Sequence, residues 1–199
     1  MKLFTAITGA SGMPYARRFL SYLAEGGHEL HLTISPAGFM VLKEELGLSL
    51  SGTPPKQITG ILGQEFRLPG NFTYVDRNDF HSSAASGTGG MEAMVIIPCS
   101  MGTLARIAQG ISGNLIERAA DVILKENRPL ILVPRETPFN QIHLKNMLRL
   151  QRAGAAIVPA MPAFYGRSQS VADLVDFVVG KVLDQLSIKH DLLERWGER

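Results

Sequence analysis

The sequence contains a single cysteine, Cys99, among its 199 residues. One cysteine excludes a disulfide within the chain and any zinc site that needs several cysteines. The histidines offer no alternative, because none stands with other histidines or carboxylates at the spacing of metal ligands, and His143 lies alone in a predicted helix. The sequence therefore predicts a protein without a bound metal, and its cysteine usage is typical of the reducing cytoplasm.

Two further features are missing: a long apolar run and an excess of charge of one sign. No apolar stretch reaches the roughly 18 residues that a membrane-spanning helix requires, and the N-terminus lacks the basic, apolar and cleavable regions of a signal peptide. Lysine and arginine total 20, against 18 aspartates and glutamates. This balance argues against nucleic acid or an anionic membrane as a partner, whereas a local site for small anions stays open.

What the sequence does contain is an alternation of short apolar runs and amphipathic stretches. With 45% hydrophobic residues, the chain can bury the core of one domain, which we place at residues 1–199 with a C-terminal tail from about residue 187. Such alternation is typical of an α/β protein with a parallel sheet. The predicted strands are residues 3–7, 30–34, 93–98, 130–133 and 155–158. The predicted helices are residues 14–24, 37–46, a short one after residue 104 that ends at about 109, 115–125, 140–153 and a last one from 170.

The most informative stretch is residues 93–104, AMVIIPCSMGTL. A β-branched run ended by a proline indicates a buried strand. Ser100, Gly102 and Thr103 follow where this strand emerges, and they offer two hydroxyls and several unobstructed backbone amides. In open α/β sheets, ligands bind outside the carboxyl ends of the strands. The stretch predicts either a ligand-binding loop or an ordinary helix cap, and its residues alone leave both interpretations open.

The first predicted strand leads into a second candidate loop, TGASG, at residues 8–12. A glycine-rich turn followed by a helix that begins near Pro14 is suited to bind an anion, and phosphate is the natural guest. The spacing of Gly9 and Gly12 does not match the dinucleotide fingerprint, and no acidic residue ends the second strand. Ser35 stands there instead. It favours a mononucleotide over NAD, or it simply caps the helix that follows.

A third loop, PRETP, follows the strand at residues 130–133. Arg135 and Glu136 are held there between two prolines, at the carboxyl end of the strand. This arrangement favours an anion clamp with an adjacent proton donor. The alternative is a structural ion pair between the two side chains.

The last predicted helix starts at Ser170, with Asp173 placed to cap it reciprocally. Lys181 lies in the apolar stripe of this helix. A lysine in such a stripe either extends its charged end to water or has a buried anionic partner. Because the loops upstream favour anions, we expect the buried partner.

Three other side chains also have two interpretations each. Glu45 lies among the charges of a predicted helix, where it is either on the solvated face or catalytic, and the solvated face is expected. Lys125 near the C-terminal end of its helix either complements the helix dipole or binds an anion. Tyr165 in PAFYG is either a phosphate-binding phenol or a packing residue of a loop.

The pattern weakens between residues 51 and 90, where prolines and glycines interrupt it. Residues 82–90, SSAASGTGG, are too small to form core. Because long loops in compact domains are commonly functional, we expect a ligand-covering loop in this region.

Five blocks of the sequence together resemble one family. They are TGASG, SAASGTGGMEAMVIIPCSMGTL, NLIERAADVILKE, RPLILVPRETP and PAFYGRSQSVADLVDFVVGKVLDQL. They resemble the UbiX/Pad1 flavin prenyltransferases, over residues 3–186. The resemblance implies a three-layer, Rossmann-like (flavodoxin-like) α/β fold around a mostly parallel sheet. It also implies metal-independent transfer of a dimethylallyl group from dimethylallyl monophosphate to N5 and C6 of reduced FMN.

The same resemblance implies partners. The product, prenylated FMN, would serve a UbiD-type decarboxylase. The protein would form a large homo-oligomer, such as a dodecamer, with its sites at subunit interfaces.

The resemblance also assigns roles to individual residues. Those implied to bind FMN are Gly9, Ala10, Ser11, Ser35, Ser100, Met101, Gly102, Thr103 and Arg135. Those implied to grip the prenyl phosphate are Arg118, contributed across a subunit interface, and Lys125, Arg135, Tyr165 and Lys181. Glu136 would assist the departure of phosphate, and Ser11 and Glu45 would handle the proton lost from the flavin ring. Related sequences often carry arginine at the position of Lys181, so phosphate affinity is expected to be lower here.

Two alternatives remain in other classes. One is a flavoprotein that oxidatively decarboxylates cysteine-containing substrates, which the resemblance associates with an early histidine and a later asparagine-methionine pair. Residues 13–24 contain no histidine and residues 159–166 no asparagine, which argues against that class. The other is a non-catalytic module that binds and delivers FMN, in which Glu136 and Lys181 would be dispensable.

Overall fold

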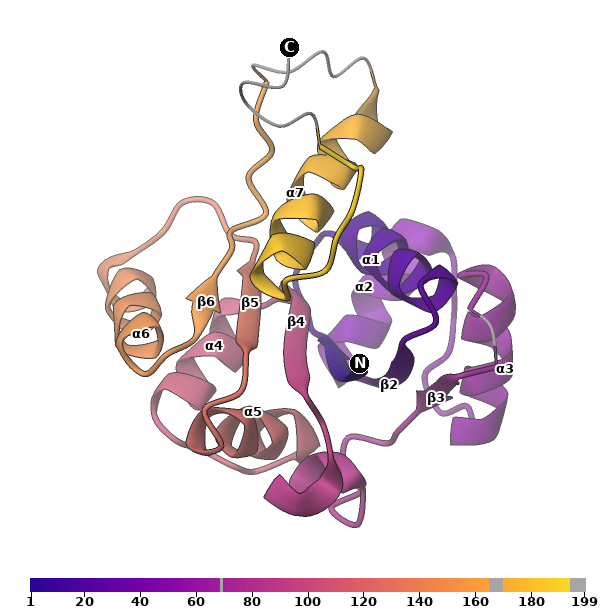
Figure 1. The fold of residues 1–199 in the computed structure, drawn as a ribbon, viewed down its shortest axis with the longest axis horizontal. Coiled ribbons are helices and arrows are strands. Elements are labelled where there is room, and N and C mark those ends of the chain that lie inside the picture. Colours follow the sequence, from indigo (N-terminus) through magenta and orange to yellow (C-terminus); the bar gives the residue numbers. More distant parts are fainter. Residues whose placement is uncertain (69, 165–169, 194–199) are drawn as a thin grey trace.

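A computed structural model describes residues 1–68, 70–164 and 170–193. The described residues form one six-stranded sheet in the order β3-β2-β1-β4-β5-β6, in which all neighbouring strands are parallel (Figure 1). The strands are β1 Lys2–Ile7, β2 Glu29–Ile34, β3 Phe72–Tyr74, β4 Ala93–Cys99, β5 Leu130–Pro134 and β6 Ala156–Ile157. The strand order reverses between β1 and β4, and such a reversal is where open α/β sheets bind their ligands.

Helices cover both faces of the sheet, so the molecule has three layers (Figure 1). The helices are α1 Met13–Glu25, α2 Pro36–Leu46, α3 Pro55–Glu65, α4 Met101–Ala108, α5 Leu115–Lys125, α6 Gln141–Arg152 and α7 Val171–Gln185. On one face lie α1, α2, α3 and α7, whose apolar side chains share one core. On the other face α4, α5 and α6 share a second core. The predicted α/β fold is therefore confirmed.

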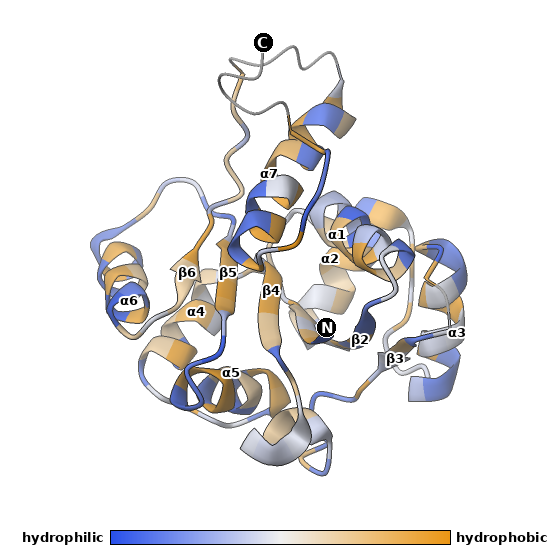
Figure 2. Cartoon of the chain, viewed as in Figure 1, coloured by the Kyte–Doolittle hydropathy of each residue, from blue (hydrophilic) through white to orange (hydrophobic). Residues whose placement is uncertain are grey.

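The strands separate these two cores by their alternation. On β1, Leu3 and Ile7 belong to the core beneath α1 and α7, whereas Phe4 and Ala6 belong to the core beneath α4 and α5. Successive side chains of a strand point to opposite faces, and a parallel sheet covered on both faces is apolar throughout. Figure 2 accordingly shows the central strands β4 and β5 as hydrophobic along their length, while the helices carry mixed faces.

The region between residues 51 and 90 differs from the prediction of a ligand-covering loop. It contains α3, the edge strand β3 and two 3₁₀ turns at Ser83–Ala85 and Gly87–Gly89. Ile58 and Leu62, one helical turn apart, are buried. Glycines at 60 and 63 within that helix hide its period in the sequence. For residues 55–65 the loop prediction was wrong, because weak helix formers can still form a helix when tertiary contacts bury one face.

Several local predictions are confirmed. Asn114 caps α5, and Ser170 and Asp173 form the reciprocal cap of α7.

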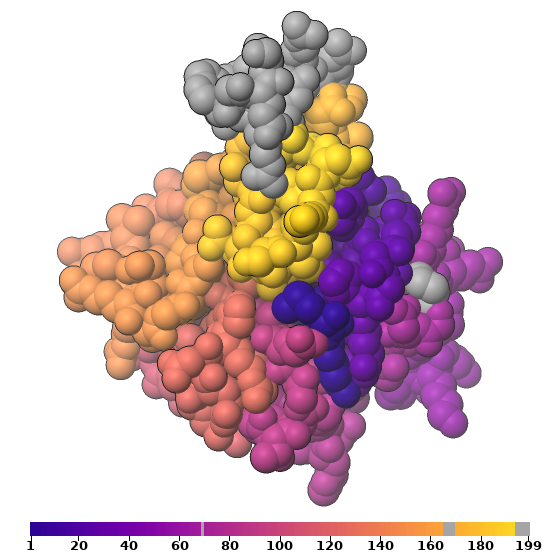
Figure 3. All heavy atoms as spheres, viewed as in Figure 1, coloured from indigo at the N-terminus to yellow at the C-terminus, as the bar shows by residue number. Residues whose placement is uncertain are grey.

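Figure 3 shows α7, in yellow, at the surface between the N-terminal elements and the later segments of the chain. Beyond α7, Ile188 and Leu192 pack against the first core.

Candidate functional site

A cavity of about 490 Å³ lies at the carboxyl edge of the sheet, beside the reversal of strand order. It is built from the ends of β1, β2 and β4, from the first residues of α2, α4 and α5, and from the segment after β3. The lining residues are Gly9, Ser35, Pro36, Ala37, Arg77, Ser100, Gly102, Thr103, Arg106, Asn114, Ile116 and Glu117. Five predicted FMN residues, from three separate parts of the sequence, thus meet at one cavity.

Three helices begin at this cavity, and each is capped by a lining residue. Ser35 Oγ accepts from Gly38 N at 3.0 Å, and Ser100 Oγ accepts from Thr103 N at 3.3 Å. Asn114 Oδ1 accepts from Ile116 N at 3.0 Å. The positive ends of three helix dipoles therefore face one space, which favours an anion there. Ser35 and Ser100 thus cap their helices and also line the cavity, so the two interpretations of each residue are compatible.

Gly9 allows these elements to approach closely. A Cβ atom at Gly9 would lie 2.3 Å from the Cβ of Ala37, at the start of α2. Only glycine permits the turn after β1 to lie directly on α2. The glycine therefore helps to shape the cavity wall.

The N-terminus of α1 differs from its prediction as a phosphate site. The Glu45 carboxylate accepts from Gly12 N at 3.0 Å and from Met13 N at 2.8 Å. These are the amides that an anion would need. The anion bound at this helix terminus is thus a side chain of the protein. The prediction that this terminus binds a phosphate was wrong.

Glu45 is nevertheless held in a defined environment. Partial burial raises the pKa of Glu45. This effect is outweighed by hydrogen bonds from the Ser11 side chain, Met13 N and Gly12 N and by the charge of Arg135, so the pKa lies below its usual value. Near neutral pH, Glu45 is therefore a carboxylate hydrogen-bonded to the Ser11 hydroxyl. The structure brings together the two side chains to which the resemblance assigns proton handling.

Arg135 and Glu136 follow β5 at the same edge of the sheet. Arg135 Nε donates to the backbone oxygen of Ser11 at 3.2 Å, so Arg135 lies beside the turn after β1. Glu136 accepts from Thr137 N at 3.1 Å. No ion pair joins Arg135 and Glu136, both of which belong to the described part of the chain. The structural alternative, an ion pair between these two side chains, was therefore wrong.

Thr8 is a residue that sequence reasoning missed. Its buried hydroxyl donates to Pro98 O at 2.9 Å and accepts from Ser100 N at 2.7 Å. One side chain thus joins the loop after β1 to the loop after β4. Its place at the head of TGASG was the only signal in the sequence.

Beneath the cavity, Glu117 connects α4 with α5. Its side chain is 3% exposed and accepts from Arg106 Nε at 2.5 Å, from Gly113 N at 2.7 Å and from Asn114 Nδ2 at 2.8 Å. Burial raises its pKa, but these hydrogen bonds hold it below the usual value. Arg106 is consequently committed to a carboxylate of its own chain.

Cys99, next to Ser100, is not a nucleophile in this structure. Burial raises the pKa of its thiol to about 12, and the thiolate is the reactive form. The sulfur packs in the second core instead.

The structure does not bring Arg118 and Lys125 to Arg135 within one chain. Helix α5 starts at the cavity and spans about 16 Å toward the opposite edge of the sheet. Arg118 donates to Ala85 O at 3.0 Å and to Asp121 at 3.0 Å. Lys125, at the far end of the helix, pairs with Glu126 at 3.3 Å. Both cations lie on the surface, half exposed or nearly so.

Lys181 also differs from its prediction. Its side chain is 48% exposed and lies 3.9 Å from Asp184, one turn further along α7, and 5.7 Å from the Phe177 ring centre. The expectation of a buried anionic partner was wrong, because the long aliphatic chain lets the charged end reach water. Tyr165 lies outside the described residues.

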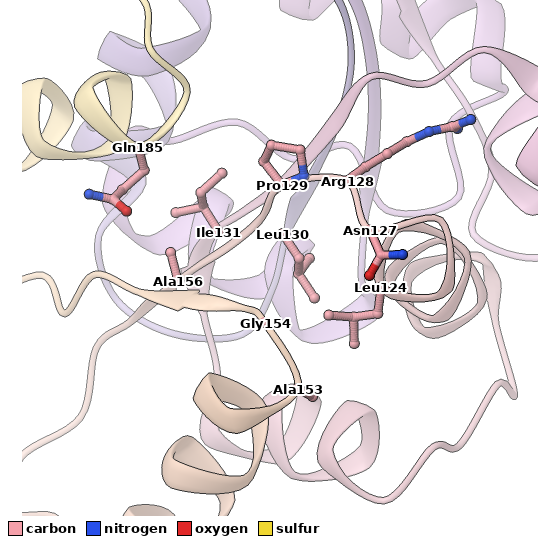
Figure 4. A pocket seen from close by; sticks show the side chains of 10 residues that line it. All are labelled: Leu124, Asn127, Arg128, Pro129, Leu130, Ile131, Ala153, Gly154, Ala156 and Gln185. Carbon is pink, nitrogen blue, oxygen red and sulfur yellow. The ribbon is translucent and has the colours of Figure 1, made fainter.

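A second cavity, of about 380 Å³, lies at the opposite edge of the sheet, near the start of β5 (Figure 4). Its arginine, Arg128, extends away from the other lining side chains (Figure 4) and donates to Met91 O at 2.8 Å and Gly87 O at 2.9 Å. Its charge is used within the fold, so this cavity lacks a free cation.

No group of three or more His, Cys, Asp or Glu in residues 1–68, 70–164 and 170–193 could hold a metal ion. No helix in that part of the chain has the length and apolar character required to cross a membrane.

A parallel sheet whose carboxyl edge carries an anion-favouring cavity of this size defines a mononucleotide-binding α/β protein. The chain belongs to the Flavoprotein family, whose model matches residues 1–183, and within it to the UbiX flavin prenyltransferases. Flavin prenyltransferase UbiX of Halalkalibacterium halodurans is 50% identical over 193 residues, which cover 96% of this chain and 91% of the relative.

Two solved structures have the same fold over nearly their whole length. One is AnUbiX (PadA1) in complex with FMN and dimethylallyl pyrophosphate, with a TM-score of 0.85, 36% identity and coverage of 100% of this chain and 98% of that chain. The other is a dodecameric FMN-dependent UbiX-like decarboxylase from Escherichia coli O157:H7, with a TM-score of 0.86, 38% identity and 100% coverage of both chains.

Proposed function

We propose that the protein is a flavin prenyltransferase that transfers a dimethylallyl group from dimethylallyl monophosphate to reduced FMN. The observation that carries this proposal is that Gly9, Ser35, Ser100, Gly102 and Thr103 meet at one cavity. Beside it, Arg135 donates a hydrogen bond to the backbone oxygen of Ser11. The chain's membership in the UbiX family supports the same activity.

The residues of the cavity fit FMN. Its terminal phosphate needs amide donors and positive charge, which the starts of α2, α4 and α5 supply. Its size lies in the range of small-molecule pockets. Gly9, Ser35, Ser100, Met101, Gly102 and Thr103 would hold it together with Ala10, Ser11 and Arg135. Reduced FMN, when bound, supplies the electron-rich N5 and C6 positions that accept the dimethylallyl group.

The leaving group sets the electrostatic requirement. When the bond between the allylic carbon and the phosphate oxygen breaks, negative charge develops on oxygen and positive charge on carbon. Arg135 and Lys181 would stabilise the phosphate, and Arg118 and Lys125 of a neighbouring copy would join them, with Tyr165 as a further ligand. Glu136 would deliver a proton to the departing phosphate. Fixed charges of this kind are worth several kcal/mol of activation free energy in a site that excludes water.

The second requirement is proton transfer as the new ring closes. N5 and C6 would each lose a proton, the C=C bond of the prenyl group would gain one as its tertiary carbon bonds to C6, and the departing phosphate would take the other. Ser11 and Glu45 are hydrogen-bonded, and the lowered pKa of Glu45 keeps it ionised near neutral pH. Ser11 would pass the C6 proton to the Glu45 carboxylate. A carboxylate that already holds the start of α1 is well fixed for this role, because its position needs no rearrangement.

The proposal includes the assembly and its setting. A large homo-oligomer, such as a dodecamer, would bring α5 of one copy to the cavity edge of another. The product would pass to a UbiD-type decarboxylase. The setting would be the cytoplasm, because a buried thiol without a disulfide partner and a reduced flavin both suit a reducing compartment.

Phosphate release tests the activity. The protein is incubated anaerobically with dimethylallyl monophosphate, with and without reduced FMN, and inorganic phosphate is measured. Release that requires reduced FMN and falls strongly in Glu136→Gln and Lys181→Ala supports transfer. Release without flavin would indicate a phosphatase instead, and no release from a flavin-bound protein would favour the FMN-delivery module.

A further inference from the structure

Arg77 is the arginine of the cavity that has no partner of its own. Two arginines line the cavity, Arg77 and Arg106. Arg106 forms two hydrogen bonds with the buried Glu117, at 2.5 and 3.3 Å. The side chain of Arg77, in contrast, has no hydrogen bond or ion pair with any described residue. A guanidinium that lines a cavity without a partner has five N–H donors available to a ligand.

The backbone of Arg77 is nevertheless fixed. Its carbonyl oxygen accepts from Leu115 N at 2.7 Å, at the start of α5. Two residues earlier, Val75 N donates to Leu32 O at 2.8 Å and so continues the pairing of β3 with β2. The carboxylate of Asp76 accepts from Asn78 N at 2.8 Å, which shapes the following turn. The segment thus holds Arg77 at the rim of the cavity while its charge stays uncommitted.

The other cavity groups explain what this charge is for. The starts of α2, α4 and α5 each contribute a partial positive charge of about half a unit. Their backbone amides are neutral donors. The charge of Arg106 is neutralised by Glu117, so it adds no net positive charge to the cavity. A phosphate monoester carries close to two negative charges at neutral pH. Arg77 is the free cation of the cavity within the described part of the chain.

We propose that Arg77 binds the terminal phosphate of FMN and is the residue by which the protein distinguishes FMN from riboflavin. This inference rests on the proposed function, since it assumes that the cavity holds FMN. It gives Arg77 a specificity role that is separate from the cations for the prenyl phosphate. Arginine suits it because its planar fork matches two phosphate oxygens.

The test compares FMN and riboflavin, which differ only in the phosphate. Binding of both flavins is titrated by fluorescence to the wild type, Arg77→Gln, Arg77→Lys and the matched control Arg152→Gln, which alters an exposed arginine of α6. Loss of a charged hydrogen bond is expected to weaken FMN binding about 10- to 100-fold in Arg77→Gln. Riboflavin affinity should stay unchanged, Arg77→Lys should recover part of the loss, and Arg152→Gln should match the wild type.

Other outcomes would overturn the inference. Equal weakening of FMN and riboflavin would show that Arg77 supports the fold of the cavity and not the phosphate. Unchanged FMN binding in Arg77→Gln would show that Arg77 has no role in binding. If Arg77→Gln fails to fold, Arg77→Lys decides the question. Weakened binding of FMN with full binding of riboflavin by Arg77→Lys supports the inference. Wild-type affinity of Arg77→Lys for both flavins contradicts it. A wild type that binds neither flavin would instead contradict the proposed function itself.

Discussion

Glu45 illustrates how one side chain decides what a helix terminus binds. The turn after β1 has the features of an anion site, but its amides at Gly12 and Met13 already hold the Glu45 carboxylate. The starts of α2 and α4 face the cavity without an acidic residue in their first turn, and at the start of α5 the Glu117 carboxylate is paired with Arg106. A single long-range contact thus separates the phosphate region from the region of Ser11 and Arg135.

The Glu45 contact predicts a pH dependence of stability. The folded-state pKa lies below the ordinary value of 4.5, so the carboxylate stabilises the folded state above that pH, and the stabilisation is lost as the pH falls through the folded-state pKa. Glu45→Gln should lower the free energy of unfolding by about 1 kcal/mol near neutral pH. The deficit should shrink as the pH falls below about 4.5. Urea unfolding at several pH values measures it.

Glu44→Gln is the matched control for this experiment, because Glu44 is the exposed neighbour on the same helix. It should leave the free energy of unfolding nearly unchanged at each pH. A Glu45→Gln deficit that is constant from neutral to acidic pH would contradict the assigned role of the carboxylate.

Thr8 is the second residue whose contacts make a sharp prediction. Thr8→Val keeps the shape of the side chain but leaves Ser100 N and Pro98 O without their hydroxyl partner. A buried polar group without a partner costs about 1–3 kcal/mol. Thr8→Val should therefore lower the free energy of unfolding by that amount and weaken FMN binding, whereas Thr8→Ser should recover most of both. Equal losses in the valine and serine variants would point to packing of the methyl group instead.

At the scale of elements, the Glu117 carboxylate couples α4 to α5 beneath the cavity. The two partners differ in environment, since the Glu117 side chain is 3% exposed and that of Arg106 is 50% exposed. Changing the buried partner to glutamine should cost more, because one of its two acceptor oxygens becomes an NH2 group, so either Gly113 N or Asn114 Nδ2 also loses its acceptor. We expect a loss of about 1–3 kcal/mol for Glu117→Gln and less for Arg106→Gln.

A double-mutant cycle measures this coupling. The double variant should be about as stable as Glu117→Gln alone, because the Arg106 interaction is already lost in that variant. Fully additive losses would show that Arg106 and Glu117 do not interact. The same variants report on the cavity, since α4 and α5 both begin at it.

The elements also show what the sequence can predict. Strands such as β4 and β5 are continuous apolar runs with a proline at or next to their last residue, and caps such as Asn114 are local signals. The helix α3 escapes prediction because Gly60 and Gly63 obscure its period. Contacts such as that of Glu45 with Gly12 join residues 33 positions apart, and no local pattern records them. Arg77 is likewise defined only by what the fold places around it.

At the scale of the whole molecule, α5 carries two cations, Arg118 and Lys125, that do not line the cavity of its own chain. Lys125 ends that helix, and the segment around Glu126 lies against Gly87, before the start of β4. Helix α6 exposes apolar side chains, with Ile142 66%, Leu144 54% and Leu148 50% exposed. A self-assembling protein can bury such a surface between copies.

A site shared between copies predicts complementation. Arg118→Ala and Arg135→Ala, each inactive alone, should regain activity when the two chains are co-assembled, because some sites then combine an intact Arg118 with an intact Arg135. Random assortment restores up to about a quarter of the sites. The matched control pairs Arg135→Ala with Glu136→Ala, which come from the same chain and should restore nothing. Failure of the first pair to exceed the second would place Arg118 outside a shared site.

The mass of the extracted flavin distinguishes transfer of the prenyl group from binding of FMN alone. The protein is incubated anaerobically with reduced FMN and dimethylallyl monophosphate, and the extracted flavin is weighed by mass spectrometry. We expect a flavin heavier by one dimethylallyl unit with the wild type, and unmodified FMN with Glu136→Ala. Unmodified FMN from a folded, flavin-bound wild type would contradict the proposed transfer.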